Sequence, residues 1–222
     1  MSKALFITAT GTDVGKTYVT ALIVKKLRES GINAGYYKAA LSGAESIADS
    51  DAGYVNKTAG INQPENTLLS YMYKTAVSPH LAAKIEGNPV TLEKIKADFS
   101  KVAKSYDFVT VEGAGGIVCP IRYDETAHIF LEDIIRTLDL GTVIIADAGL
   151  GTINAVVTTA EYIKSRNIDI KGVILNNWAG GIMQEDNAKM ITDITGLEVL
   201  AKVKKGDTSL DIDPEKLAGL YN

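Results

Sequence analysis

The segment over residues 8–17, Thr-Ala-Thr-Gly-Thr-Asp-Val-Gly-Lys-Thr, constrains the fold of this chain more than any other stretch. The apolar run before it is typical of a short buried strand, and the residues after it carry apolar side chains at helical spacing. A strand, a flexible loop and a Gly-Lys-Thr sequence that opens a helix favour a site for nucleotide phosphates over an ordinary turn. In such a site Lys16 contacts the β- and γ-phosphates, and the hydroxyl of Thr17 is a ligand for Mg²⁺.

Apolar, β-branched runs alternate with helical patterns along the whole chain. The expected strands are Ala4–Thr8, Ala34–Lys38, Phe108–Glu112, Thr142–Asp147, Lys171–Asn176 and Glu198–Val203. The expected helices are Thr17–Ser30, Ser50–Ala59, Ser78–Glu86, Thr91–Ser105, Ile129–Leu138, Ile153–Arg166 and Met183–Thr195. Several strands are apolar on both faces, which predicts an α/β fold with a mostly parallel central sheet between helical layers. No linker or repeat divides the pattern, so we expect one domain over residues 1–222.

Composition restricts the class of protein. With 46% hydrophobic and 23% charged residues the chain is typical of a globular protein, and its net charge of −4 gives no reason to expect a nucleic acid or a membrane as partner. No apolar run reaches the roughly 18–20 residues that span a bilayer. No leader precedes the first strand, and a single cysteine fits a reducing compartment, so we expect a cytoplasmic protein. That cysteine, Cys119, is interpreted as a small buried apolar residue rather than a catalytic one.

Polar residues gather where the predicted strands end, which is where ligands bind in open parallel sheets. Lys38 ends the second strand and is either a solvated surface charge or a second cation for transferring phosphate. Ser42 and Gly43 follow it, and they are interpreted either as a small anion-binding turn or as a simple turn. Glu112 ends the next strand and leads into the turn at residues 113–116, a position that favours a Mg²⁺ ligand over a capping carboxylate.

Other polar residues at helix starts and strand ends have two interpretations each. Asp51 opens a predicted helix as its N-cap, and becomes a second metal ligand only if that helix end faces the site. The helix start at residues 151–154 binds an anion or is simply capped, and capping is the favoured interpretation. Asn176 either contacts a purine or forms a turn. His80 is expected to be structural.

Six segments, in this order and at this spacing, resemble the dethiobiotin synthetase family. They are Thr8–Thr17, Tyr37–Gly43, Ser50–Ala52, Ser78–His80, Val111–Gly116 and Leu150–Asn154. The resemblance extends over residues 1 to about 178. The Val-Glu-Gly-Ala-Gly-Gly segment also occurs in related ATP-dependent amide-forming ligases, whereas the lysine–serine segment combined with Ser-Pro-His is specific.

The resemblance implies a P-loop NTPase-like three-layer sandwich and a ligase of biotin biosynthesis. Such an enzyme closes the ureido ring of dethiobiotin from 7,8-diaminononanoate (diaminopelargonate) and CO₂, using Mg-ATP. In the family, a substrate amine forms a carbamate with CO₂, and the carbamate oxygen attacks the γ-phosphate to give a carbamic-phosphoric anhydride. The neighbouring amine then displaces phosphate. The implied partners are these small molecules and a second copy of the chain, in a homodimer whose substrate site lies at the subunit interface.

The resemblance also implies roles for the residues at matching positions. The residues implied in catalysis are Thr12, Lys16, Lys38 and Ser42, and those implied as Mg²⁺ ligands are Thr17, Asp51 and Glu112. The expected nucleotide-binding residues are Asp13, Val14, Gly15, Lys16, Thr17, Tyr18, Glu112, Gly115 and Asn176, the last at the adenine. The expected diamine-binding residues are Thr12, Asp13, Lys38, Ser42, Pro79, Gly151, Thr152 and Asn154. The last three are expected to hold the carboxylate of the diamine from the partner subunit.

The chain departs from the family pattern in the phosphate loop and after the last strand. Ala9 stands where the family loop usually opens with glycine, Thr10 where the general phosphate-loop pattern has its first glycine, and Gly11 where the family usually has an acidic residue. The segment Ala201–Asp207 lacks the proline-containing sequence that closes over the base, which predicts weak selectivity for adenine.

Three other classes are alternatives. A ligase that amidates a corrin ring carries a further glutamine-hydrolysing domain with a cysteine nucleophile, for which this chain has no room. An ATPase switch of the partitioning or nitrogenase-reductase kind carries a signature lysine at the position of Gly11. A simple kinase would not need the segment over residues 38–42 together with Ser-Pro-His.

Overall fold

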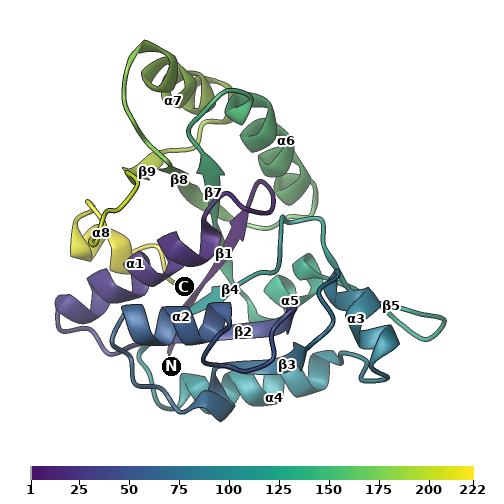
Figure 1. The fold of residues 1–222 in the computed structure, drawn as a ribbon. Coiled ribbons are helices and arrows are strands. Elements are labelled where there is room, and N and C mark those ends of the chain that lie inside the picture. Colours follow the sequence, from purple (N-terminus) through teal and green to yellow (C-terminus); the bar gives the residue numbers. More distant parts are fainter. Residues whose placement is uncertain (1) are drawn as a thin grey trace.

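A computed structural model of the protein describes residues 2–222. Its central layer is a seven-stranded sheet in the order β3-β2-β4-β1-β7-β8-β9, in which every pairing is parallel (Figure 1). The strands are β1 (Lys3–Ala9), β2 (Ala34–Ser42), β3 (Leu69–Tyr73), β4 (Phe108–Glu112), β7 (Gly141–Asp147), β8 (Ile170–Asn176) and β9 (Val199–Lys202). The predicted α/β fold with a parallel central sheet is therefore confirmed.

Helices cover both faces of the sheet. One face carries α1 (Lys16–Glu29), α2 (Asp51–Thr58) and α8 (Pro214–Ala218). The other carries α3 (Pro79–Ile85), α4 (Leu92–Ala103), α5 (Leu131–Leu138), α6 (Thr152–Ser165) and α7 (Ile182–Thr195). Strand β1 shows why both faces are apolar, since Leu5 and Ile7 pack on the first face and Phe6 on the second. No helix within residues 2–222 has the length and apolar character needed to cross a membrane.

The strand register brings distant polar residues together at one edge of the sheet. Lys38 of β2 lies beside Glu112 of β4, and Glu112 lies beside Ile7 of β1. Residues 10–15 follow β1 directly, so the loop that leads into α1 starts next to this pair. The neighbours of β1 are β4 and β7, from much later in the chain, and ligands bind at such a change of direction in open α/β sheets.

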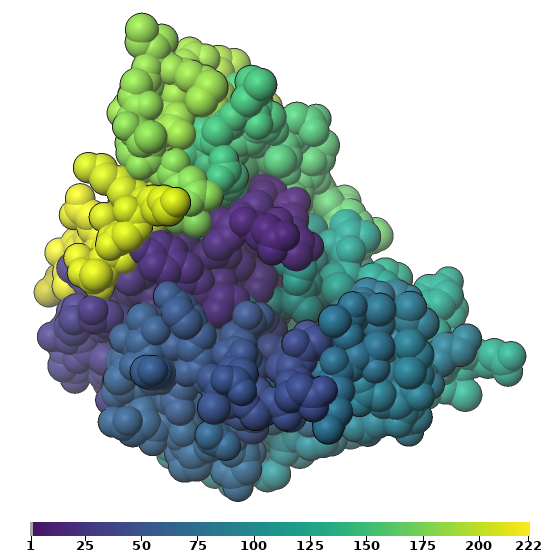
Figure 2. Space-filling model, in the orientation of Figure 1, coloured from purple at the N-terminus to yellow at the C-terminus, as the bar shows by residue number. Residues whose placement is uncertain are grey.

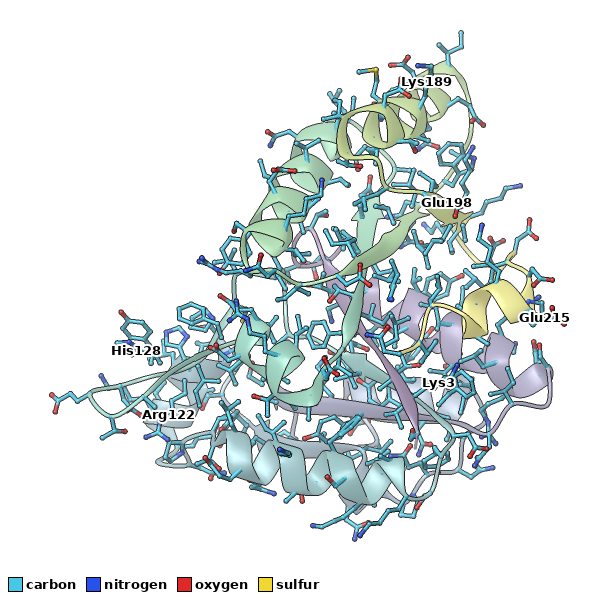
Figure 3. All side chains as sticks on the ribbon, turned by 180° about the vertical axis from the view of Figure 1, so that it is seen from behind. Lys3, Arg122, His128, Lys189, Glu198 and Glu215 are labelled. Carbon is cyan, nitrogen blue, oxygen red and sulfur yellow. The ribbon has the colours of Figure 1, made fainter. Side chains whose placement is uncertain are left out.

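The structure differs from the predicted elements in three regions. Strand β2 continues to Ser42, four residues past its predicted end, because it pairs there with β3, a strand that the sequence pattern did not reveal. The helix expected from residue 129 begins at Leu131, because β6 (His128–Phe130) pairs with β5 (Pro120–Tyr123) in a hairpin. Figure 3 shows this hairpin extending away from the body of the protein, with Arg122 and His128 on it. The short 3-10 turn η1 (Glu65–Thr67) and helix α8 were also not predicted.

Candidate nucleotide-binding active site

The loop between β1 and α1 is shaped by two residues with left-handed backbone. Asp13 has a φ of 61° and Gly15 a φ of 85°. Gly15 also has no room for a side chain, because a Cβ there would lie 2.1 Å from Nδ2 of Asn176. That nitrogen donates a hydrogen bond to the carbonyl of Val14 at 2.9 Å. Since Gly15 is the N-cap of α1 and has no capping side chain, the first amides of α1 remain available for an anion.

Four charged side chains meet beside this loop. Nζ of Lys16 donates to Oε1 of Glu112 at 2.6 Å, and the hydroxyl of Thr17 donates to the same oxygen at 2.8 Å. Nζ of Lys38 lies 3.0 Å from that oxygen and 2.5 Å from Oδ2 of Asp51. Glu112 and Lys38 are almost completely buried, with 1% and 2% of their surface exposed. Two positive and two negative groups therefore form a neutral cluster, which offsets the cost of burying the charges.

The surroundings of these groups shift their pKa values in different directions. Burial alone would raise the pKa of Glu112, but the ammonium groups of Lys16 and Lys38 outweigh it and lower the pKa to about 2. Burial lowers the pKa of Lys16, although Glu112 opposes the shift. Burial also lowers the pKa of Lys38, but the carboxylates of Glu112 and Asp51 outweigh burial, and the pKa is raised. Glu112 and Lys38 are therefore both charged at neutral pH.

A cavity of about 770 Å³ opens beside the charged cluster. It lies where the loop at the start of α1, the end of β2, the segment before α3 and the loop after β4 come together, on the face shown in Figure 2. The residues that line it are Gly11, Thr12, Asp13, Gly15, Lys16, Thr17, Tyr18, Lys38, Leu41, Ser42, Gly43, Asp51, Ala76, Val77, Ser78, Pro79, Ala114, Gly115, Gly116, Val118, Cys119 and Pro120. Its size is typical of a small-molecule site.

Most of the predicted site residues line this cavity, whereas Val14, Glu112 and Asn176 lie next to its lining. Glu112 bonds to both lysines, and Asn176 bonds to the loop at Val14. The helix start at residues 151–154 is different, since none of its residues lines the cavity. The lining residues that sequence reasoning did not assign to the site include residues 76–78 and 118–120, although Ser78 belongs to one of the segments that carry the family resemblance.

Two interpretations of strand-end and helix-start residues are wrong. Lys38 is neither solvated nor at the end of its strand, because β2 continues past it and its side chain is covered. Asp51 is not the N-cap of α2, because Ser50 takes that position and accepts from the amide of Gly53 at 3.3 Å. The carboxylate of Asp51 is therefore left for Lys38.

The favoured capping interpretation of the α6 start is also wrong, because the N-cap of that helix is Gly151 and not Thr152 or Asn154. Cys119 lies half-buried at the cavity wall. Burial raises the pKa of its thiol to about 11, so it is protonated and unreactive at neutral pH. The hydroxyl of Ser78 and Nδ1 of His80 lie 3.1 Å apart in a local contact.

Replacing Glu112 by glutamine leaves Lys16 and Lys38 with only the half-exposed Asp51 as a carboxylate partner. We expect the free energy of unfolding near neutral pH to fall by about 3–5 kcal/mol, because a buried charge loses its partner. The depressed pKa of Glu112 contributes stability above its unfolded value of 4.5, and this stability is lost as the pH falls towards 2.

Urea unfolding of the wild type and the Glu112→Gln variant at several pH values measures this effect. The difference in unfolding free energy should be constant above about pH 5 and should shrink below the unfolded pKa of the carboxyl group. The surface substitution Glu125→Gln is the control for a general loss of charge. A difference that stays constant down to about pH 3 would contradict the assignment of the depressed pKa to Glu112.

Solved structures of other proteins share this architecture. A chain of the MinC:MinD cell division protein complex from Aquifex aeolicus matches with a TM-score of 0.56 and 15% identity, over 92% of this chain and 82% of that one. A ParA family ATPase from Chlorobium tepidum matches with a TM-score of 0.54 and 13% identity, over 99% and 90%. Such low identity shows the fold alone, and it confirms the P-loop NTPase-like architecture.

Sequence comparisons are far more specific. A family model described as an AAA domain matches residues 3–209. The ATP-dependent dethiobiotin synthetase BioD of Brachyspira hyodysenteriae is 53% identical over 212 residues, which are 95% of this chain and 96% of that protein. The BioD protein of Clostridium botulinum strain 657 is 49% identical over 226 residues, covering 100% of this chain and 99% of the relative. This chain belongs to the family of ATP-dependent dethiobiotin synthetases, which are ligases.

Proposed function

We propose that the protein closes the ureido ring of dethiobiotin from 7,8-diaminononanoate and CO₂ at the expense of ATP, in the cytoplasm. The observation that carries the proposal is the convergence of Lys16, Lys38 and Glu112 beside a cavity of about 770 Å³. Phosphoryl transfer depends on positioning and on neutralising charge, and it needs no protein nucleophile. A site with two buried ammonium groups and a free helix N-terminus suits that chemistry.

ATP is placed with its phosphates at the start of α1. Lys16 releases the carboxylate of Glu112 and binds the β- and γ-phosphates, which carry more negative charge than one carboxylate. Thr17, Asp51 and Glu112 are the proposed Mg²⁺ ligands. They offer a hydroxyl and two carboxylates, and this all-oxygen donor set fits an ion that takes its other ligands from water and phosphate. When bound, Mg²⁺ supplies positive charge at the phosphate oxygens.

The diamine is placed at the other side of the cavity, by Thr12, Asp13, Lys38, Ser42 and Pro79. One amine adds to CO₂ and loses a proton to give a carbamate. The carbamate oxygen attacks the γ-phosphorus, and the bond to ADP breaks. The second amine then attacks the carbamoyl carbon, a proton and phosphate leave, and the ring is closed. The ammonium of Lys38 neutralises charge on the carbamate and on the transferred phosphoryl group.

A second copy of the chain is proposed to complete the diamine site. Three features of the segment over residues 150–154 support this. The helix start has no capping side chain, the buried hydroxyl of Thr152 has no partner within the described part of the chain, and Leu150 is 93% exposed. A helix N-terminus attracts a carboxylate, so the start of α6 in one copy suits the distant carboxylate of a diamine bound to the other.

Asn176 is proposed to contact the adenine. Its Nδ2 is already bonded to the carbonyl of Val14, whereas its buried Oδ1 has no partner among residues 2–222. An orphaned acceptor beside the phosphate loop suits the amino group of a base.

Replacing Lys16 by alanine should abolish turnover and leave the fold intact. The reaction mixture contains diaminopelargonate, bicarbonate and Mg-ATP, and the readouts are substrate-dependent ADP release and dethiobiotin. We expect a loss of at least about a hundredfold in kcat, because Lys16 neutralises the transferring charge. The exposed Lys57 on α2, replaced by alanine, is the control. Absence of dethiobiotin with the wild type would refute the proposed function, and retained activity in Lys16→Ala would remove the loop from the mechanism.

Replacing Asn154 by alanine should raise the KM for the diamine by about tenfold, with a smaller effect on the KM for ATP. The reason is the loss of a hydrogen bond to a charged carboxylate at the start of α6. Steady-state kinetics with each substrate varied in turn measures both constants. Ser165→Ala, at the other end of the same helix, should change neither. An unchanged diamine KM in Asn154→Ala would mean that this residue does not contact the substrate.

We expect the site to discriminate weakly between adenine and guanine, so that ATP and GTP support similar turnover. The segment after β9 lacks proline and is attached through its backbone, since the Tyr18 hydroxyl donates to the carbonyl of Asp207 and Nζ of Lys25 donates to the carbonyl of Thr208. Selectivity requires groups that pair with one base and are left unpaired by the other. Initial rates with each nucleotide at saturating diamine give the comparison, and a large preference for ATP would contradict the prediction.

A further inference from the structure

The carboxylate of Glu112 has one more partner, on the side away from the cavity. The hydroxyl of Tyr36 donates to Oε2 of Glu112 at 3.3 Å. The other oxygen, Oε1, accepts from Lys16, Thr17 and Lys38. Among the hydrogen bonds within residues 2–222, Tyr36 is the donor that reaches Oε2, so the two oxygens are bound in different ways.

Tyr36 is itself held by the side chain of Gln63. The amide of Tyr36 donates to Oε1 of Gln63 at 3.0 Å, and Nε2 of Gln63 donates to the Tyr36 carbonyl at 2.9 Å. These bonds replace a strand partner, because β3 pairs with β2 only from Lys38 and Leu69 onward. Asn56 of α2 binds the backbone of Gln63 at 2.9 and 3.0 Å. Tyr36 is completely buried and Gln63 is 3% exposed, so the hydroxyl has a fixed position.

We propose that Tyr36 is a positioning residue that orients Glu112 for the reaction. The inference rests on the proposed role of Glu112 as a Mg²⁺ ligand. Lys16, Thr17 and Lys38 all bind one oxygen of the carboxylate, and Lys16 and Thr17 turn to phosphate and metal when Mg-ATP binds. The hydroxyl of Tyr36 stays bonded to Oε2 while Lys16 and Thr17 change partners, so that Oε1 remains directed at the loop. Partners of this kind set the orientation of metal-binding carboxylates.

The substitution Tyr36→Phe removes the hydroxyl and keeps the ring. Mn²⁺, which replaces Mg²⁺ in oxygen sites and is visible by electron paramagnetic resonance, is titrated into the full-length protein in the presence of ADP. We expect its affinity to fall about tenfold. The Mg²⁺ concentration for half-maximal rate should rise by a similar factor, whereas the affinity for ADP without metal and the KM for the diamine should change by less than about twofold.

Tyr37→Phe is the matched control. Tyr37 is the next residue of β2 and is equally buried, but it packs on the opposite face of the sheet. Its hydroxyl bonds to Ser70 and to the carbonyl of Ile95, away from Glu112. We therefore expect Tyr37→Phe to bind Mn²⁺ as the wild type does, even where thermal unfolding shows a similar loss of stability in both variants.

Glu112→Gln serves as the reference for the metal site. If Glu112→Gln weakens Mn²⁺ binding and Tyr36→Phe does not, the role of Tyr36 is overturned while the proposed function stands. Equal weakening in Tyr36→Phe and Tyr37→Phe would also overturn it, since the effect would then be a general one. If Glu112→Gln binds Mn²⁺ as the wild type does, the metal role proposed for Glu112 fails, and the role of Tyr36 fails with it.

Discussion

The rest of the site depends on one buried carboxylate oxygen. Oε1 of Glu112 accepts hydrogen bonds from Lys16 and Thr17 at the start of α1 and from Lys38 in β2. Three segments that are far apart in the chain are thereby joined at one atom. A buried ammonium without a partner costs several kcal/mol, roughly 3–5 when an existing pair is broken. The register that sets Lys38 beside Glu112 therefore serves both the stability of the sheet edge and the arrangement of the site.

The same contact also prepares the site for a nucleotide. Lys16 is already directed to the edge of the sheet and already charge-paired, so a phosphate replaces one anionic partner with another. Gly15 leaves the first amides of α1 uncapped, and Asn176 supports the loop from β8. Most of the ordering that phosphate binding requires is thus present before any ligand arrives, which favours affinity because less entropy is lost on binding.

The sequence pattern predicted the fold well where strands are buried on both faces. Strand β4 has its predicted bounds, and β1, β7, β8 and β9 agree to within one residue at each end. Strand β3 was missed because Leu69–Tyr73 is short, carries polar and aromatic side chains and lies at the edge of the sheet. The hairpin was missed for a related reason, since its strands of four and three residues are defined by their pairing with each other. Such strands depend on partners rather than on their own periodicity.

The sequence by itself determined the phosphate loop, with Lys16 and Thr17 at a helix start, and a carboxylate at the end of a buried strand. These are local features, because a loop between a strand and a helix is specified by adjacent residues. Only the tertiary structure decided that Lys38 is buried, that Ser50 frees Asp51 for it, and that the hydroxyl of Tyr36 reaches Glu112. The contacts of Lys38 with Asp51 and of Tyr36 with Glu112 join residues 13 and 76 positions apart, and the tertiary fold rather than local spacing brings them within bonding distance.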